Sequence, residues 1–281
     1  MATRRTDLHS ANRFPAEDFG KKWVNLHIAE KQAQSVGQPT ADRGAMASLD
    51  DRTLRFASWG VVVATAILFF TRLGARALWS SEFRWAEIAR EMIRSGNYFW
   101  PTINGHVYYD KPLGSYWLVL AATWVSGAMN ELASRIPCAI AGLVAVILMI
   151  ALARRLYDAR TGVISGMILA TSFSFVFFSR HASADVETIT GELGAILLYM
   201  KFEETPDGWW VCWLWMIMAA TSLTKGLLGF VLPIMVIGVY ATLGGGLQEF
   251  WQAISSGPLV ARFRWILDRN RWLFNWKSAI A

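Results

Sequence analysis

The sequence predicts an all-α fold, namely a polytopic membrane protein built as a bundle of about six transmembrane helices. Of its 281 residues, 54% are hydrophobic, and the mean hydropathy is +0.32. Soluble domains are about 45–50% apolar even when glycine is counted, whereas here the 22 glycines come in addition. The stretches 136–153, 161–179 and 226–247 carry no charged side chain. Because a helix needs about 20 apolar residues to cross a bilayer, these stretches meet or approach the required length.

Residues 1–55 are expected to form a flexible cytoplasmic tail before the membrane domain. They are polar and mixed in charge, and they lack the early apolar core of a signal peptide. Low hydrophobicity of this kind is typical of chain segments without a packed core. The first span is then expected at 56–72, between Arg55 and Arg72.

A long polar and aromatic segment, 73–112, follows the first span. Within it, the pattern over 82–95 predicts an amphipathic helix that ends at Gly96. The apolar residues of this helix recur at three-to-four spacing: Trp85, Ile88 and Met92. We therefore expect one juxtamembrane helix in this first outer loop.

Residues 113–130 are apolar enough to cross the membrane, but the orientation of the chain favours a different placement. Arg154, Arg155 and Arg160 form a short basic loop, and such loops are typically cytoplasmic. If 113–130 crossed, that loop would lie outside. We therefore expect 113–130 to form an interfacial helix, the second juxtamembrane helix of the first outer loop.

The remaining apolar stretches complete a transmembrane domain over 56–245. The expected spans after the first are 133–153, 161–179, 188–201, 208–223 and 226–245. The segment 246–281 is rich in arginine and is expected to be a cytoplasmic or membrane-surface tail. Both ends of the chain are then predicted to be cytoplasmic.

This topology places three charged segments on the outer face: 73–112, 180–187 and Lys225. Carboxylates at one mouth of a bundle can activate a hydroxyl group, and cations can hold a phosphate. The arginines of the first loop have a plainer explanation as anchors at the membrane interface: Arg72, Arg76, Arg90 and Arg94.

The composition also argues against other classes of function. The net charge of +6 and the pI of about 9.5 fit the excess of Lys and Arg in cytoplasmic loops, and no basic motif interleaved with aromatics indicates a nucleic-acid partner. Cys138 and Cys212 lie in apolar spans and are expected to be core residues. A small transporter would fit six spans, but the two halves show no internal repeat.

Five motifs in order carry a resemblance to a known family. They lie at 78–92 (LWSSEFRWAEIAREM), at 104–105 with 108–113 (NG and YYDKPL), at 133–137 with 153–157 (ASRIP and ARRLY), at 179–185 (SRHASAD) and at 223–226 (LTKG). The chain resembles, over roughly 57–245, the N-terminal half of the GT-C polyprenyl-phosphate-sugar glycosyltransferases of glycosyltransferase family 39. That family includes the aminoarabinose transferases of lipid A and the protein O-mannosyltransferases.

The resemblance implies an inverting transfer of a sugar from a polyprenyl phosphate to an envelope lipid, glycan or protein, at the outer face of the bacterial inner membrane. It assigns catalytic roles to Glu82 and Asp185. Phosphate binding falls to three basic residues: Arg84, Lys111 and Lys225. Three further residues are expected in the site or beside a metal: Asp110, Glu187 and His181. No cofactor is certain, and a divalent metal stays open.

Two departures from the family pattern qualify this reading. Ser81 stands where the family usually has an aspartate, so the catalytic role is expected to pass to Glu82. The family's enzymes are also considerably longer. The alternative is therefore a non-catalytic membrane subunit of the same family, or a split enzyme whose second chain supplies the C-terminal half.

Overall fold

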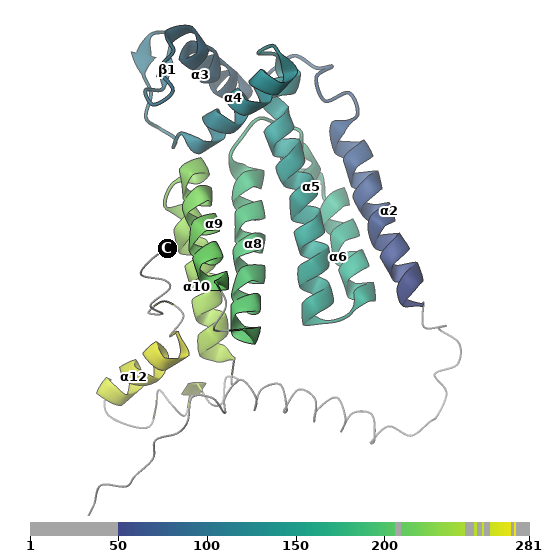
Figure 1. Ribbon diagram of the computed structural model, residues 1–281, viewed down its shortest axis with the longest axis vertical. Helices are drawn as coiled ribbons and strands as arrows, with labels where there is room; N and C mark the ends of the chain where they lie inside the picture. Colours follow the sequence, from purple (N-terminus) through teal and green to yellow (C-terminus); the bar gives the residue numbers. More distant parts are fainter. Residues whose placement is uncertain are drawn as a thin grey trace, which may run out of the picture. The chain divides into compact units, whose positions relative to one another are not determined.

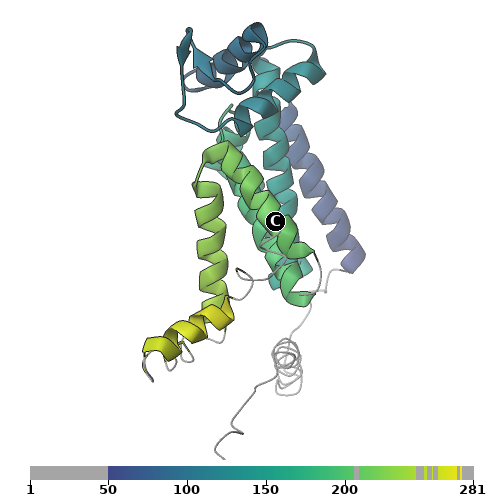
Figure 2. The same cartoon turned by 60° about the vertical axis from the view of Figure 1, so that its left-hand side comes forward.

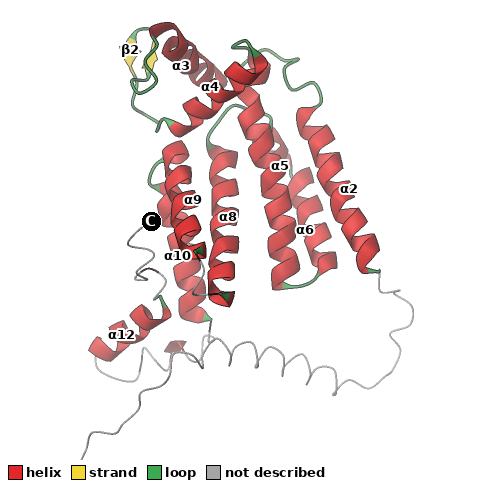
Figure 3. Cartoon of the chain, in the orientation of Figure 1, coloured by secondary structure: helices red, strands yellow, loops and turns green. Residues whose placement is uncertain are grey.

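The computed structural model describes residues 50–205, 209–244, 250–251, 255, 259–270 and 273. Most of the predicted tails, 1–49 at the start and much of 246–281, lies outside the described residues. The described part is a helical bundle with one two-stranded hairpin (Figures 1 and 3). The predicted all-α membrane bundle is confirmed.

The bundle consists mainly of helices that run side by side (Figure 1), together with one seven-residue helix, Phe173–Ser179. They are α2 (Asp51–Phe70), α5 (Glu131–Leu156), α6 (Ala159–Thr171), α7 (Phe173–Ser179), α8 (Asp185–Glu204), α9 (Trp210–Lys225) and α10 (Leu228–Leu243). Side chains fix two of the helix starts, because Asn130 and Asp158 accept backbone N–H bonds at the beginning of α5 and α6.

These helices stand where the six spans are predicted, with small shifts of boundary. By length and composition, α2 and α5 could each cross a membrane alone, and α6 with α7, bent by 67°, could form a third span. The count of six stays a prediction. The last residues of the predicted flexible tail, 51–55, belong to α2, which therefore begins earlier than the predicted start at 56.

Two shorter helices lie across one end of the bundle (Figures 1 and 2). They are α3 (Glu82–Ser95) and α4 (Gly114–Ser126), and the hairpin β1 (Thr102–Ile103) and β2 (His106–Val107) lies between them in sequence. These are the two predicted juxtamembrane helices. Their apolar faces pack on each other, with the rings of Trp85 and Tyr116 4.9 Å apart. We call this end of the bundle the α3/α4 end.

The opposite end of the bundle carries the connection between α5 and α6. This connection lies beside the basic residues Arg154, Arg155 and Arg160. Helix α12 (Leu259–Arg269) also lies at this end (Figure 1), where the Asn270 amide donates to the Thr242 hydroxyl at 3.1 Å. The basic loop and the described part of the C-terminal segment therefore lie away from α3 and α4.

Helix α4 lies directly against the backbone of α9. A Cβ added at Gly114 would lie 2.5 Å from the carbonyl oxygen of Leu223. Contacts this short to backbone cannot be relieved by moving a side chain. The absence of a side chain at Gly114 therefore sets how closely the juxtamembrane layer approaches the bundle.

We predict that Gly114→Ala destabilises the protein by about 1–3 kcal/mol, because overpacking forces the backbone to move. Thermal unfolding in detergent measures this. Gly60→Ala is the matched control, since a Cβ at Gly60 in α2 meets no atom within 4 Å. The control is expected to be neutral or stabilising, because alanine favours helix more than glycine does. Equal losses for the two variants would contradict the close approach.

Candidate active site

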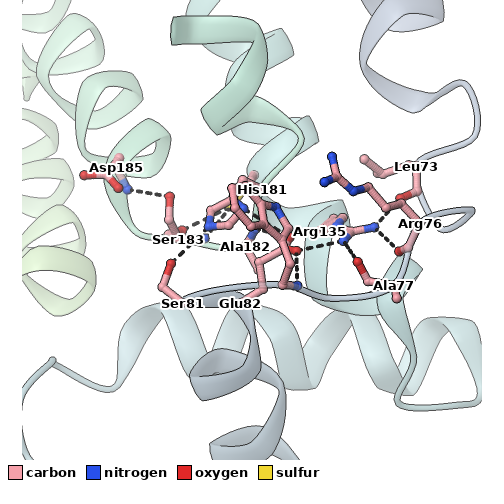
Figure 4. Close-up of polar contacts among 12 residues, drawn as sticks. Leu73, Arg76, Ala77, Ser81, Glu82, Arg135, His181, Ala182, Ser183 and Asp185 are labelled. Carbon is pink, nitrogen blue, oxygen red and sulfur yellow. Dashed lines mark hydrogen bonds and ion pairs between the residues drawn. The ribbon is translucent and has the colours of Figure 1, made fainter.

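A buried ion pair lies at the centre of the α3/α4 end. Glu82, the first residue of α3, is 0% exposed, and Arg135 of α5 is 3% exposed. The Arg135 guanidinium donates from Nε to Glu82 Oε1 and from Nη2 to Glu82 Oε2, both at 2.7 Å (Figure 4). Bidentate pairs of this kind are the strongest arginine–carboxylate arrangement.

The remaining N–H groups of Arg135 bind the loop that joins α2 to α3. They donate to the carbonyl oxygens of Leu73 at 2.9 Å, Arg76 at 2.8 Å and Ala77 at 3.1 Å (Figure 4). All five guanidinium N–H groups are therefore used. One side chain thus holds the loop and the start of α3 against α5.

Glu82 also accepts backbone N–H bonds from the loop between α7 and α8 and from the loop before α3. Its Oε1 accepts the backbone N–H of Ala182 at 3.0 Å, and its Oε2 accepts that of Trp79 at 3.2 Å. Burial alone would raise the pKa of Glu82, but the hydrogen bonds from Arg135, Ala182 and Trp79 hold it below its ordinary value. The carboxylate is charged, fully bonded and without exposed surface.

His181 lies next to this pair and contacts the residue that departs from the family pattern. Its Nε2 lies 3.0 Å from the Ser81 hydroxyl oxygen, and its Nδ1 lies 3.5 Å from Glu82 Oε1. Burial lowers the pKa of the His181 imidazole, so the ring is neutral at pH 7. We call Ser81, Glu82, Arg135 and His181 the Glu82 cluster.

A second group of charges lies at the ends of α8 and α9. Lys225, the last residue of α9, forms an ion pair with Asp185, the first residue of α8. Both side chains remain about one-third exposed, at 33% and 38%. Lys225 also lines a cavity of about 450 Å³ together with Asp110 and Lys111, which we call the lysine cavity.

Arg84 joins the lysine cavity through a tyrosine. It donates to the Tyr108 hydroxyl at 2.8 Å, and this hydroxyl donates to Asp110 Oδ2 at 3.2 Å. Lys111 lies 3.3 Å from the same oxygen, and these contacts, led by that of Lys111, lower the pKa of Asp110. Lys111 and Lys225 therefore line one cavity, and Arg84 lies beside it through its contacts with Tyr108 and Asp110.

An apolar groove of about 1200 Å³ adjoins the lysine cavity. Its walls come from α4, α5, α8 and α9 and include Leu118, Val144 and Leu197. The groove and the cavity meet at two points of the chain. Gly114 and Thr224 line the groove, and their sequence neighbours Leu113 and Lys225 line the cavity. Glu187 lies in the groove, buried, and its carboxylate accepts the Ser115 hydroxyl.

The residues predicted to lie beside a metal do not come together. Asp110 lines the lysine cavity, Glu187 the apolar groove and His181 a third cavity. Within the described part of the chain, no group of three His, Cys, Asp or Glu side chains is placed to hold a metal ion.

The sequence did not identify the buried partner of Glu82, which is Arg135. Arg135 was included in the motif 133–137 without a role. An arginine at the start of an apolar span needs a buried partner, and this is the signal that could have identified it. The catalytic role of Glu82 stays a prediction, and Glu82 lines a different cavity from Lys225.

Comparison with known proteins places these features in a family. The family model described as dolichyl-phosphate-mannose-protein mannosyltransferase matches residues 110–256. A protein of Aquifex aeolicus is 35% identical over 187 residues, which are 65% of this chain and 37% of that protein. An undecaprenyl phosphate-alpha-4-amino-4-deoxy-L-arabinose arabinosyl transferase of Pseudomonas fluorescens is 28% identical, over 74% of this chain and 39% of its own length.

Two solved structures of a related protein are similar to this chain in fold. The crystal structure of ArnT from Cupriavidus metallidurans in the apo state has a TM-score of 0.60 and 25% identity, over 78% of this chain and 42% of that one. The structure of the same protein bound to undecaprenyl phosphate has a TM-score of 0.60, 26% identity, and covers 78% and 41%. The chain thus spans about two-fifths of the length of the relatives it matches.

We predict that Arg135→Met costs about 3–5 kcal/mol of stability, because it leaves the Glu82 charge buried without a partner. The double variant Glu82→Gln/Arg135→Met should lose less than the sum of the two single variants. Denaturant unfolding in micelles measures both. The exposed Asp51–Arg55 pair supplies the control, and Arg55→Met should change stability by less than about 1 kcal/mol. An Arg135→Met loss as small as that of the control would rule out the buried pair.

The depressed pKa of Glu82 also predicts a pH dependence. A carboxyl whose folded-state pKa lies below its ordinary 4.5 stabilises the fold above that pH, and this contribution is lost as the pH falls through the folded-state pKa. The melting temperature should therefore fall less steeply with acidification in Glu82→Gln than in the wild type. Glu87→Gln, which removes a half-buried carboxylate of α3 that pairs with Arg90, should follow the wild-type slope. Parallel slopes for all three proteins would contradict the assignment.

Proposed function

The chain belongs to the dolichyl-phosphate-mannose-protein mannosyltransferase family, and from this membership we propose that it is a membrane glycosyltransferase with a polyprenyl-phosphate sugar donor. One observation carries the proposal: a long apolar groove adjoins a cavity that is lined by Lys111 and Lys225. A polyprenyl-phosphate sugar has the same division, with an apolar tail and a charged head. The tail would lie in the groove and the phosphate in the lysine cavity.

Arg84, Lys111 and Lys225 act on the leaving group in this proposal. The bond from the anomeric carbon to the phosphate oxygen breaks, and negative charge grows on the departing lipid phosphate. Fixed cations stabilise this charge more in the transition state than in the ground state. The ion pair that Lys225 makes with Asp185 would then be exchanged in part for the phosphate.

Asp185 is the proposed acid–base group. The acceptor oxygen attacks the anomeric carbon from the face opposite the phosphate, so the configuration inverts. The acceptor's proton passes to the Asp185 carboxylate, which is partly exposed and close to the cations. We assign Glu82 a positioning role instead, because its carboxylate has no exposed surface.

The proposed orientation places the α3/α4 end outside the bacterial inner membrane, with both termini inside. The basic residues Arg154, Arg155 and Arg160 beside the opposite end support this orientation, because such residues are enriched in cytoplasmic loops. The first donor to test is undecaprenyl phosphate-alpha-4-amino-4-deoxy-L-arabinose, since the names of relatives specify it. An envelope lipid is the first acceptor to test, ahead of a glycan or a protein.

A second candidate function is a membrane subunit of this family that binds the donor without turnover. Ser81 in place of the usual aspartate favours it, together with the complete burial of Glu82. In that case a second chain would supply the residues that complete the site. Transfer measured with and without such a chain separates this function from the first.

We predict that Asp185→Asn lowers the transfer rate by about 100-fold or more, as expected for loss of an acid–base group. Transfer of labelled sugar to envelope lipid in nanodiscs measures it. Asp51→Asn is the control, because Asp51 is an exposed acid at the start of α2. Turnover unchanged in Asp185→Asn would remove Asp185 from the mechanism, and wild-type turnover that appears only when a second chain is added would favour the second candidate function.

We predict a different effect for Lys225→Gln, which should weaken donor binding by about 10–100-fold through loss of a charge-assisted contact. Titration with the polyprenyl phosphate measures this. Arg55→Gln removes an exposed cation of α2 that lines neither the groove nor the lysine cavity and should leave the affinity unchanged. Equal affinities for the two variants would refute the phosphate site.

A further inference from the structure

A third cavity, of about 310 Å³, lies beside the Glu82 cluster and is separate from the proposed donor site. Besides Arg135, three arginines line it, one that follows α7 and two from the loop after α2: Arg180, Arg72 and Arg76. Aromatic side chains complete its wall: Trp79, Phe173 and Phe177. It shares no lining residue with the lysine cavity or the apolar groove. We call it the arginine pocket.

The arginine pocket carries an excess of positive charge. The acidic residue among its described lining residues is Glu82, which the buried Arg135 already neutralises. Among the described residues, no salt bridge joins Arg72, Arg76 or Arg180 to a carboxylate. Three positive charges therefore face one small space without acidic compensation.

Contacts with neutral groups hold two of these arginines in place. Arg180 donates to the carbonyl oxygens of Leu68, of Phe69 at 3.0 Å and of Thr71 at 2.9 Å, at the end of α2. The guanidinium carbon of Arg76 lies 5.3 Å from the centre of the Trp79 ring. Placing the cations before a ligand arrives reduces the entropy lost on binding.

We propose that the arginine pocket binds a phosphate group, carried by an anionic lipid of the leaflet at the α3/α4 end. Guanidinium groups match the oxygens of phosphate in geometry and charge. Trp79, Phe173 and Phe177 give the pocket an apolar wall against which lipid chains could pack, and aromatic rings are enriched at membrane interfaces. The site is distinct from the proposed donor site and does not depend on catalysis.

The simpler explanation treats these arginines as general interface anchors, as the sequence alone predicts for Arg72 and Arg76. Anchors attract every anionic headgroup weakly and do not saturate with one ligand. A built pocket binds one phosphate and saturates. The number of lipids bound per protein, and the effect of matched arginine variants on that binding, therefore distinguish a pocket from general anchors.

The experiment uses the full chain in detergent, titrated with phosphatidylglycerol or with diacylglycerol of the same acyl chains, and read by native mass spectrometry. We expect the wild type to bind one phosphatidylglycerol saturably and no diacylglycerol. Arg72→Gln/Arg76→Gln should weaken this binding by at least about tenfold. The control Arg90→Gln/Arg94→Gln removes the same charge from α3, outside the pocket, and should bind as the wild type does.

A second measurement needs no variant and distinguishes a lipid phosphate from free inorganic phosphate as the ligand. Inorganic phosphate should raise the melting temperature of the wild type, since a ligand that binds only the folded state stabilises it. A rise with inorganic phosphate and none with phosphatidylglycerol would support a site for free phosphate. Non-saturable lipid binding, an equal loss in both arginine pairs, or no response to either phosphate source would overturn the proposal.

Discussion

The buried pair of Glu82 and Arg135 is the interaction on which the rest of the α3/α4 end depends. Removing two charges from water costs several kcal/mol per ion, and a buried pair repays this only when its geometry and hydrogen bonds are complete. Here they are complete, because all five guanidinium N–H groups and both carboxylate oxygens are bonded. The pair connects the loop after α2, the start of α3, the start of α5 and the loop before α8.

This connection positions the groups proposed to react. Ala182 donates its N–H to Glu82, and Asp185 begins α8 three residues later. Gly114 sets the approach of α4 to α9, which ends at Lys225. The contact with Glu82 therefore helps to position Asp185, and the packing of α4 on α9 helps to position Lys225. The Glu82 cluster also borders the arginine pocket.

The sequence predicted the features that depend on local patterns of residues, and it missed those that depend on contacts between distant segments. The spacing of Trp85, Ile88 and Met92 predicted the buried face of α3, because helical periodicity is local. The rule on basic loops correctly placed 113–130 beside the bundle, as α4. Partners of charges are not local: Glu82 and Arg135 are 53 residues apart, and no periodicity joins them. For the same reason the burial of Glu82 was not foreseen, and its role was inferred from the motif alone.

If one buried ion pair holds these segments together, hydrogen exchange at the backbone amides bound to Glu82 should depend on it. The amides of Trp79 and Ala182 lie outside regular helices, yet both donate to Glu82. The account predicts slow exchange at both amides in the wild type and fast exchange in Glu82→Ala, with α10 unchanged in both. Fast exchange at Trp79 and Ala182 in the wild type would contradict it.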